Sequence, residues 1–63
     1  EDKIDFIVDH RPKGKVTKAN RKKLWFQVRW DGFTSDHDLW LPYAELRQTE
    51  ALETYGQQMG INV

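Results

Sequence analysis

Aromatic side chains are the most conspicuous residues of this chain that could take part in chemistry, and they are crowded into one part of it. Seven of the eight aromatic residues lie between Trp25 and Tyr55. This is more aromatic surface than a core of this size requires, and the ring faces of Trp and Tyr can also serve a cationic or peptide ligand. The crowding therefore predicts a small binding module.

A catalytic function has little support in the residues. The one compact polar group is Ser35-Asp36-His37-Asp38. Neighbouring side chains point in different directions, so this group cannot combine a nucleophile, a base and an orienting residue. His37 between two acids would hold a metal only weakly, because zinc sites usually take three or four ligands from separated positions. The isolated glycines form no phosphate-binding loop. We expect residues 35–38 to form a polar turn. For the chain we expect no enzymatic activity, no metal, no cofactor and no small-molecule substrate.

Positive charge is concentrated in one segment, although the formal net charge is zero. The stretch 11–23, called here the basic segment, contains no acid and seven positive residues, Arg11, Lys13, Lys15, Lys18, Arg21, Lys22 and Lys23. Such a run attracts DNA or RNA through counterion release, with an affinity that falls steeply with salt. The simpler alternative is a solvated loop whose lysines keep sheet edges from pairing.

The length and composition indicate one small domain. A chain of 63 residues buries roughly 60% of its unfolded surface, so its core is thin. The absence of Cys favours a reducing, intracellular location. No apolar run approaches the roughly 20 residues that span a bilayer, so we expect no membrane partner. The beginning, Glu1-Asp2-Lys3, has neither an initiator Met nor a signal-peptide pattern. We expect residues 1–63 to be a single domain excised from a longer polyprotein or chromatin protein.

The first strand is predicted from about Ile4 to Arg11. Alternation along it predicts one wholly apolar face, formed by Ile4, Phe6 and Val8. Pro12 and Gly14 then break the strand, and we expect residues 12–22 to form a long, mobile connection.

A second, central strand follows at residues 24–30, with one face formed by Leu24, Phe26, Val28 and Trp30 and the other by Trp25, Gln27 and Arg29. Asp31-Gly32 closes this strand as a turn dipeptide that suits positive φ. A third short strand, Leu39-Trp40-Leu41, ends at Pro42, which cannot donate to a ladder. We expect Trp40 in the core beneath a helix.

Near the C-terminus the spacing of the apolar residues changes from that of a strand to that of a helix. An apolar stripe at helical spacing predicts a helix from about Glu50 to Gln58 that lies against the sheet, with Thr49 as its N-cap; the stripe is Leu52, Tyr55 and Met59. Gly56 lowers helix stability by roughly 1 kcal/mol relative to Ala, and Gly60 is expected to end the helix. The predicted fold class is α+β, with a three-stranded antiparallel sheet packed against one C-terminal helix.

With the strands placed, the chain resembles a chromodomain over about residues 4–56. The most specific part is Trp30-Asp31-Gly32-Phe33, followed seven residues after Phe33 by Trp40-Leu41-Pro42. Asp9-His10-Arg11, the basic segment and the sequence from Glu50 to Tyr55 are most similar to chromodomains at the C-terminus of gypsy-type LTR-retrotransposon integrases.

The resemblance implies a curved sheet of the SH3-like barrel type and a nuclear module that directs an integrase to chromatin for DNA integration. Its partner would be a histone tail or another chromatin protein. The tail would join the sheet as an added strand, and a cage of three aromatics would hold a methylated lysine, since ring faces attract a quaternary ammonium. The expected peptide-binding residues are Asp2, Phe6, Trp30, Phe33, Asp36 and Asp38. Trp30 could instead be core, because it shares a strand face with Phe26 and Val28.

The chain departs from the family pattern at three places. The first cage position is Asp2, which leaves two aromatic walls, Trp30 and Phe33. Phe6 lies four residues further on, at about 3.3 Å per residue, and would replace the missing wall only if the strand shifted. The usual acid of the Trp-Glu-Pro block is Leu41, and the connection after the first strand is longer.

Two functions therefore stay open at this stage. The first is tethering to chromatin through a histone tail, with an incomplete aromatic cage. The second is nucleic-acid or protein binding through the basic segment, with aromatics that only build the core. DNA or RNA retention that disappears near physiological salt would indicate weak electrostatics alone, whereas salt-tolerant tail binding would favour the first.

Overall fold

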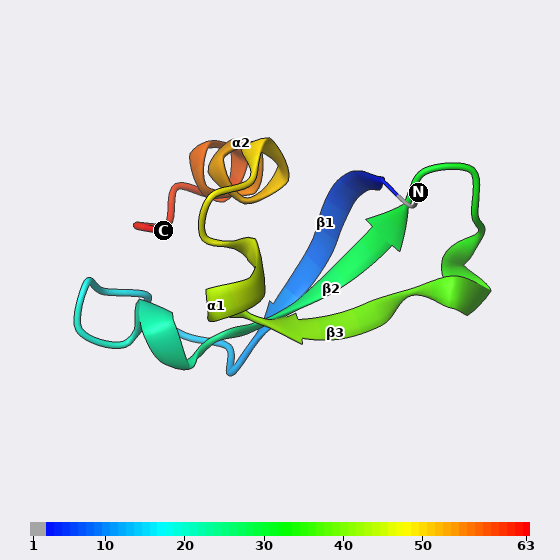
Figure 1. Ribbon diagram of the computed structural model, residues 1–63. Coiled ribbons are helices and arrows are strands. Elements are labelled where there is room, and N and C mark those ends of the chain that lie inside the picture. The colour runs from blue at the N-terminus through cyan, green and yellow to red at the C-terminus, as the bar shows by residue number, and fades with distance from the viewer. Residues whose placement is uncertain (1–2) are drawn as a thin grey trace.

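A computed structural model describes residues 3–63 of the chain (Figure 1). Its sheet is antiparallel, with the strand order β1 (Ile4–Arg11), β2 (Trp25–Trp30) and β3 (Leu39–Pro42). Two α-helices follow, α1 (Tyr43–Leu46) and α2 (Glu50–Met59), and two 3-10 turns, η1 (Arg21–Lys23) and η2 (Ser35–His37), lie in the connections. The predicted α+β fold, a three-stranded antiparallel sheet with a C-terminal helix, is confirmed. The short helix α1 was not predicted.

The core lies on one face of the sheet and draws on both helices. Phe26 and Val28 of β2 are completely buried. They are surrounded by apolar side chains from β1, the residue before β2, α1 and α2, namely Ile7, Leu24, Tyr43, Leu46, Leu52 and Tyr55. The predicted faces of β2 are confirmed from Trp25 to Val28, where buried positions alternate with exposed or half-buried ones, whereas Arg29 and Trp30 are both half-buried.

The predicted buried face of β1 is wrong. Phe6 and Val8 are exposed, whereas the inward positions are Ile4, Ile7 and His10. The register with β2 shifts between Ile4 and Phe6 and again between Ile7 and Asp9. Each shift of this kind is a β-bulge, which adds a residue and exchanges the two faces of the strand. Because of the bulges, the inward-facing residues of β1 recur at every third position instead of every second position.

The predicted position of Trp40 is also wrong. Residues that stand directly opposite each other in a sheet share a face. Trp40 stands opposite Gln27, whereas Leu41 stands opposite the buried Phe26. Trp40 therefore lies on the face away from the core, half-buried, with the Arg11 guanidinium 4.0 Å from its ring centroid.

Helix α2 begins at Glu50 as predicted and ends at Met59, one residue later than predicted and directly before Gly60. The Thr49 hydroxyl accepts a hydrogen bond from the Leu52 amide at 3.3 Å, and Gly60 follows the helix in the left-handed region at φ 68°. Leu52 and Tyr55 are buried, but Met59 is 54% exposed. The predicted stripe therefore contacts the core only through its first two members.

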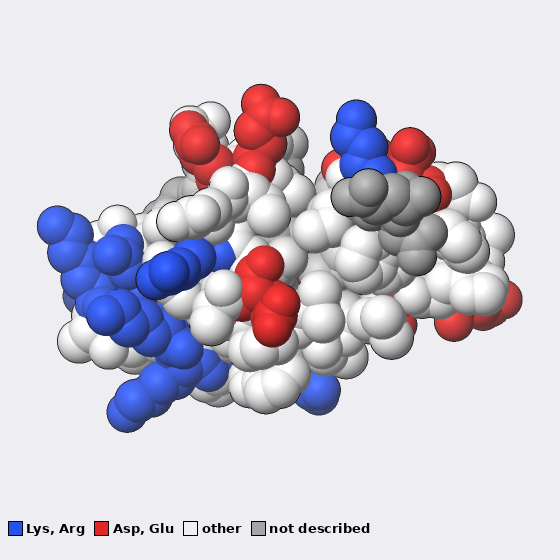
Figure 2. Space-filling model, in the orientation of Figure 1, with Lys and Arg blue, Asp and Glu red and all other residues white. Residues whose placement is uncertain are grey.

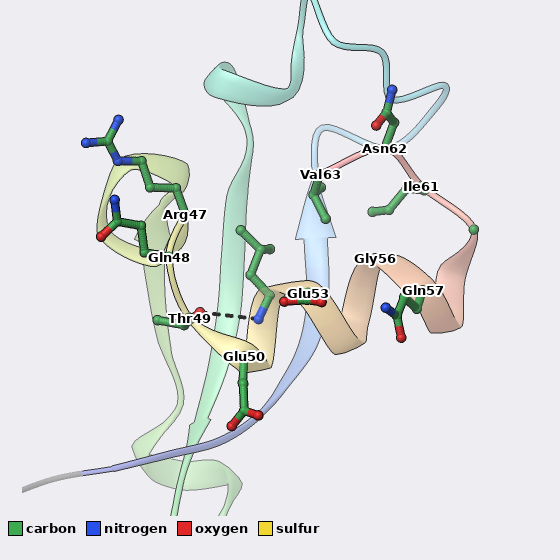
Figure 3. A pocket seen from close by; sticks show the side chains of 12 residues that line it. Arg47, Gln48, Thr49, Glu50, Glu53, Gly56, Gln57, Ile61, Asn62 and Val63 are labelled. Atoms are coloured by element: carbon green, nitrogen blue, oxygen red, sulfur yellow. Dashed lines mark hydrogen bonds between the residues drawn. The ribbon is translucent and has the colours of Figure 1, made fainter.

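Gly56 allows the C-terminal residues to fold back onto α2 (Figure 3). The Ile61 amide donates to the Gly56 carbonyl at 3.0 Å. A Cβ atom at position 56 would collide with the Val63 side chain. The glycine that lowers helix propensity thus makes room for a tertiary contact.

The basic segment is more regular than a bare loop. The Asn20 side chain accepts from the Thr17 amide at 2.8 Å and donates to the Lys15 carbonyl at 2.9 Å. Val16 packs against the core, and η1 leads directly into β2. These contacts hold the second half of the connection, while the mobility of the whole segment stays a prediction.

Candidate peptide-binding site

The end of β2 and the turn after it enclose a hollow of about 340 Å³, called here the aromatic hollow. It is lined by Trp30, Phe33, Asp36, His37, Asp38 and Leu39. The fold thus brings four of the six predicted peptide-binding residues together. They come from β2, from the turn, from η2 and from the residue before β3.

Two aromatic rings form walls of the hollow. Gly32 adopts φ 82°, a conformation that the predicted turn requires and that L side chains disfavour. The turn is closed by the Phe33 amide, which donates to the Trp30 carbonyl at 3.1 Å. Phe33 is 44% exposed, whereas Trp30 is half-buried and also packs against the core. Trp30 therefore both lines the hollow and packs against the core, and its role in a methyl-lysine cage stays a prediction.

The two acids of the hollow are in different states. Asp38 accepts from Arg29 Nε at 2.6 Å, from Arg29 Nη2 at 3.0 Å and from Gln27 Nε2 at 3.2 Å. Its side chain is 4% exposed. Asp36 is exposed at the rim of the hollow. Asp38 consequently fixes the hollow's shape, while Asp36 offers the accessible negative charge.

We expect the Arg29–Asp38 pair to make the stability of the domain depend on pH in the acid range. Hydrogen bonding from the Arg29 guanidinium holds the pKa of the Asp38 carboxyl below its ordinary value. A carboxyl whose pKa is lower in the folded state stabilises the fold above the unfolded pKa of about 3.9, and this stabilisation is lost as the pH falls through the folded pKa.

We expect Asp38→Asn to reduce the dependence of the free energy of unfolding on pH in the acid range. Urea unfolding between about pH 2 and 6 should show a smaller loss of stability in the variant than in the parent. Asp36→Asn is the matched control, because Asp36 is exposed and should leave the profile close to that of the parent. Parallel profiles for Asp38→Asn and the parent would contradict the assigned role.

Phe6 does not join the aromatic hollow. It pairs with Arg29, whose guanidinium carbon lies 5.2 Å from the Phe6 ring centroid. The third wall that a shifted strand would supply is therefore absent from the hollow among the described residues. Asp2, the sixth predicted residue, lies outside the described residues.

A groove of about 420 Å³ runs between the first half of β1 and α2. Its walls are Lys3, Ile4, Asp5, Phe6, Ile7 and Asp31, with Glu50, Ala51, Thr54, Tyr55 and Gln58 from the helix side. The Asp31 amide donates to the Lys3 carbonyl at 2.7 Å. Since Trp30 lines the aromatic hollow and Asp31 lines the groove, the two depressions are adjacent. β1 is also an edge strand.

The predicted nucleic-acid residues lie apart from the aromatic hollow. In Figure 2 most of the visible Lys and Arg side chains gather at the end of the molecule that Figure 1 shows to hold the connection between β1 and β2. The turn between β2 and β3, which carries the hollow, lies toward the opposite end. The basic segment and the aromatic hollow are therefore two separate surfaces.

A third hollow, of about 570 Å³, lies where the C-terminal residues fold back over α2 (Figure 3). Its labelled side chains are mostly polar and carry both signs of charge, including Arg47, Glu50 and Glu53. It contains no aromatic residue. Without ring faces or a cluster of like charge, it offers less for a cationic peptide than the aromatic hollow does.

One buried polar contact escaped the sequence analysis. His10 is buried, and its Nδ1 lies 2.7 Å from the Tyr55 hydroxyl oxygen. No face was assigned to His10 from the sequence, and its contact with Tyr55, 45 residues away, depends on how α2 packs against β1. Across residues 3–63 no group of three or more His, Asp or Glu could hold a metal ion. The helices in that range are too short and too polar to cross a membrane.

Comparisons with protein-family models, with curated proteins and with solved structures found no match.

Proposed function

We propose that this chain is a non-enzymatic binding module that recognises an extended, cationic peptide, and that its partner is a histone tail with a methylated lysine. By the resemblance described above, it would tether a longer protein, such as an integrase, to chromatin in the nucleus. The observation that carries the proposal is the aromatic hollow beside the groove along β1.

The hollow supplies what a methylated ammonium needs. Trp30 and Phe33 offer ring faces, and Asp36 adds a negative charge at the rim. A quaternary ammonium has no N–H to satisfy, so ring faces and a distant carboxylate suit it better than direct hydrogen bonds. With two aromatic walls the interaction is expected to be weak.

The groove supplies a place for the peptide backbone. An extended peptide can add to the free edge of a sheet through main-chain hydrogen bonds, with side chains entering alternate pockets. Residues Lys3 to Ile7 provide such an edge, and α2 closes the opposite wall. A peptide lying there would pass the end of β2 and could place a lysine side chain in the aromatic hollow.

A calorimetric titration with trimethylated and unmodified tail peptides tests this proposal. The parent should prefer the trimethylated peptide. Phe33→Ala should remove that preference, with a roughly five- to thirtyfold loss of affinity, because one desolvated cation–ring contact is worth about 1–2 kcal/mol. Phe33 suits this test better than Trp30, because Trp30 also packs against the core.

Trp25→Ala is the matched control for Phe33→Ala. Trp25 is exposed to nearly the same extent, 46% against 44% for Phe33, but it does not line the hollow or the groove. This control should retain the preference of the parent. Equal affinity of the parent for both peptides would overturn the methyl-lysine proposal.

A further inference from the structure

The face of the sheet opposite the core, called here the outer face, carries aromatic and charged side chains from all three strands. The paired positions that share this face are Phe6 with Arg29, Asp9 with Gln27, Gln27 with Trp40, Arg11 with Trp25, and Trp25 with Pro42. No helix covers these positions, because α1 and α2 contribute their buried residues to the other face.

Exposed aromatic rings are the first unusual property of the outer face. Trp25 is 46% exposed and Phe6 is 45% exposed. Trp40 lies between them on the same face, half-buried under Arg11. A single exposed aromatic needs no explanation. Three rings on one face, spread along about 13 Å of strand, form a platform for flat ligands.

The charge of the outer face is the second property. Its acids are engaged by basic partners, Asp9 by Lys13 and the neighbouring Asp38 by Arg29. The Arg11 guanidinium instead lies over the Trp40 ring, 4.0 Å from its centroid. Arg11 is also the first residue of the basic segment. The aromatic platform is therefore continuous with the positive end of the molecule in Figure 2.

We propose that the outer face and the basic segment together bind single-stranded nucleic acid. Bases would stack on Trp25 and on the Arg11–Trp40 pair, and phosphates would contact the lysines of the basic segment. Aromatic platforms beside a positive groove bind single strands in this manner, because every base has a π-face. A duplex keeps its bases stacked internally, so it would gain only the electrostatic attraction.

This site is distinct from the aromatic hollow. None of Trp25, Trp40 and Arg11 lines the hollow or the groove beside β1. It also differs from the simpler hypothesis of a basic loop with purely structural aromatics, because the exposed rings contribute directly to binding.

Fluorescence anisotropy with a labelled oligothymidylate of about ten nucleotides tests the proposal. We expect the parent to bind this single strand more tightly than a duplex of the same length. Trp25→Ala should weaken single-strand binding roughly tenfold, which is within the range for loss of one stacked base. Its effect on duplex binding should be small. Trp25→Leu keeps an apolar side chain but cannot stack, and the same loss is expected for it if Trp25→Ala folds poorly.

Two further variants complete the test. Met59→Ala removes an apolar side chain that is 54% exposed on α2 and should bind as the parent does. Lys15→Gln combined with Lys18→Gln should weaken single strands and duplexes alike and reduce the salt dependence. Equal affinity of the parent for single strand and duplex, or unchanged single-strand binding by folded Trp25 variants, would overturn the proposal.

Discussion

Phe26→Ala is expected to leave most of the domain unfolded at room temperature. Phe26 is completely buried at the centre of β2, and its ring meets Tyr55 edge-on at a centroid distance of 6.1 Å. Truncating a buried Phe costs about 3–5 kcal/mol through lost transfer free energy and the cavity left behind. A domain with so thin a core has about that much stability in total. Urea denaturation followed by circular dichroism measures the loss.

Trp40→Ala is the natural comparison for Phe26→Ala. Its side chain is larger, but it lies on the outer face under Arg11 rather than in the core. The variant should therefore remain folded. If Trp40→Ala destabilised the domain as much as Phe26→Ala does, the assignment of the two faces of the sheet would have to be reversed.

A second large loss of stability is expected when the contact between His10 and Tyr55 is removed. Tyr55→Phe removes the hydroxyl that lies 2.7 Å from His10 Nδ1 and leaves a buried ring nitrogen without its partner. An unsatisfied buried polar group costs about 1–3 kcal/mol. We expect a loss of that size in urea denaturation at pH 7, although the ring of residue 55 is preserved.

A double-mutant cycle separates this polar contact from packing. His10→Leu together with Tyr55→Phe removes both polar partners, so the double variant should be more stable than the sum of the two single losses predicts. Strict additivity would mean that the two side chains are not coupled. Burial also raises the pKa of the Tyr55 hydroxyl, so stability should fall further above about pH 10, where an unfolded Tyr ionises and the buried one resists ionisation.

The elements with an undisturbed period were the ones that could be predicted. β2 alternates without a bulge, so the faces assigned to Phe26 and Trp25 from the sequence are the observed ones. α2 has a side-chain N-cap at Thr49 and a left-handed glycine at its end, and both are visible as residue types. The buried face of β1 was predicted wrongly because two bulges interrupt the strand. Ile4–Arg11 contains no Gly or Pro that would have indicated them.

The candidate site was predictable in part. Trp30 and Phe33 are close in sequence and joined by a recognisable turn, so a resemblance could place both at one hollow. The engagement of Asp38 by Arg29 depends on the pairing of β2 with β3 and on the geometry of η2, which composition does not reveal. Trp40 was misplaced because a large aromatic in a small protein is usually core, and only the register with Gln27 shows otherwise.

The two bulges in β1 have a further consequence, for self-association. A flat, regular edge strand is a template on which a second folded copy can pair, and edge-to-edge pairing leads to aggregation. β1 is an edge strand, but its register with β2 shifts at two places within eight residues. The rigid edge of another folded copy could not follow both irregularities, whereas a flexible peptide can adjust its own backbone to them. We therefore expect the bulges to disfavour pairing between copies of the domain, whereas the backbone of an unfolded peptide could adjust to them.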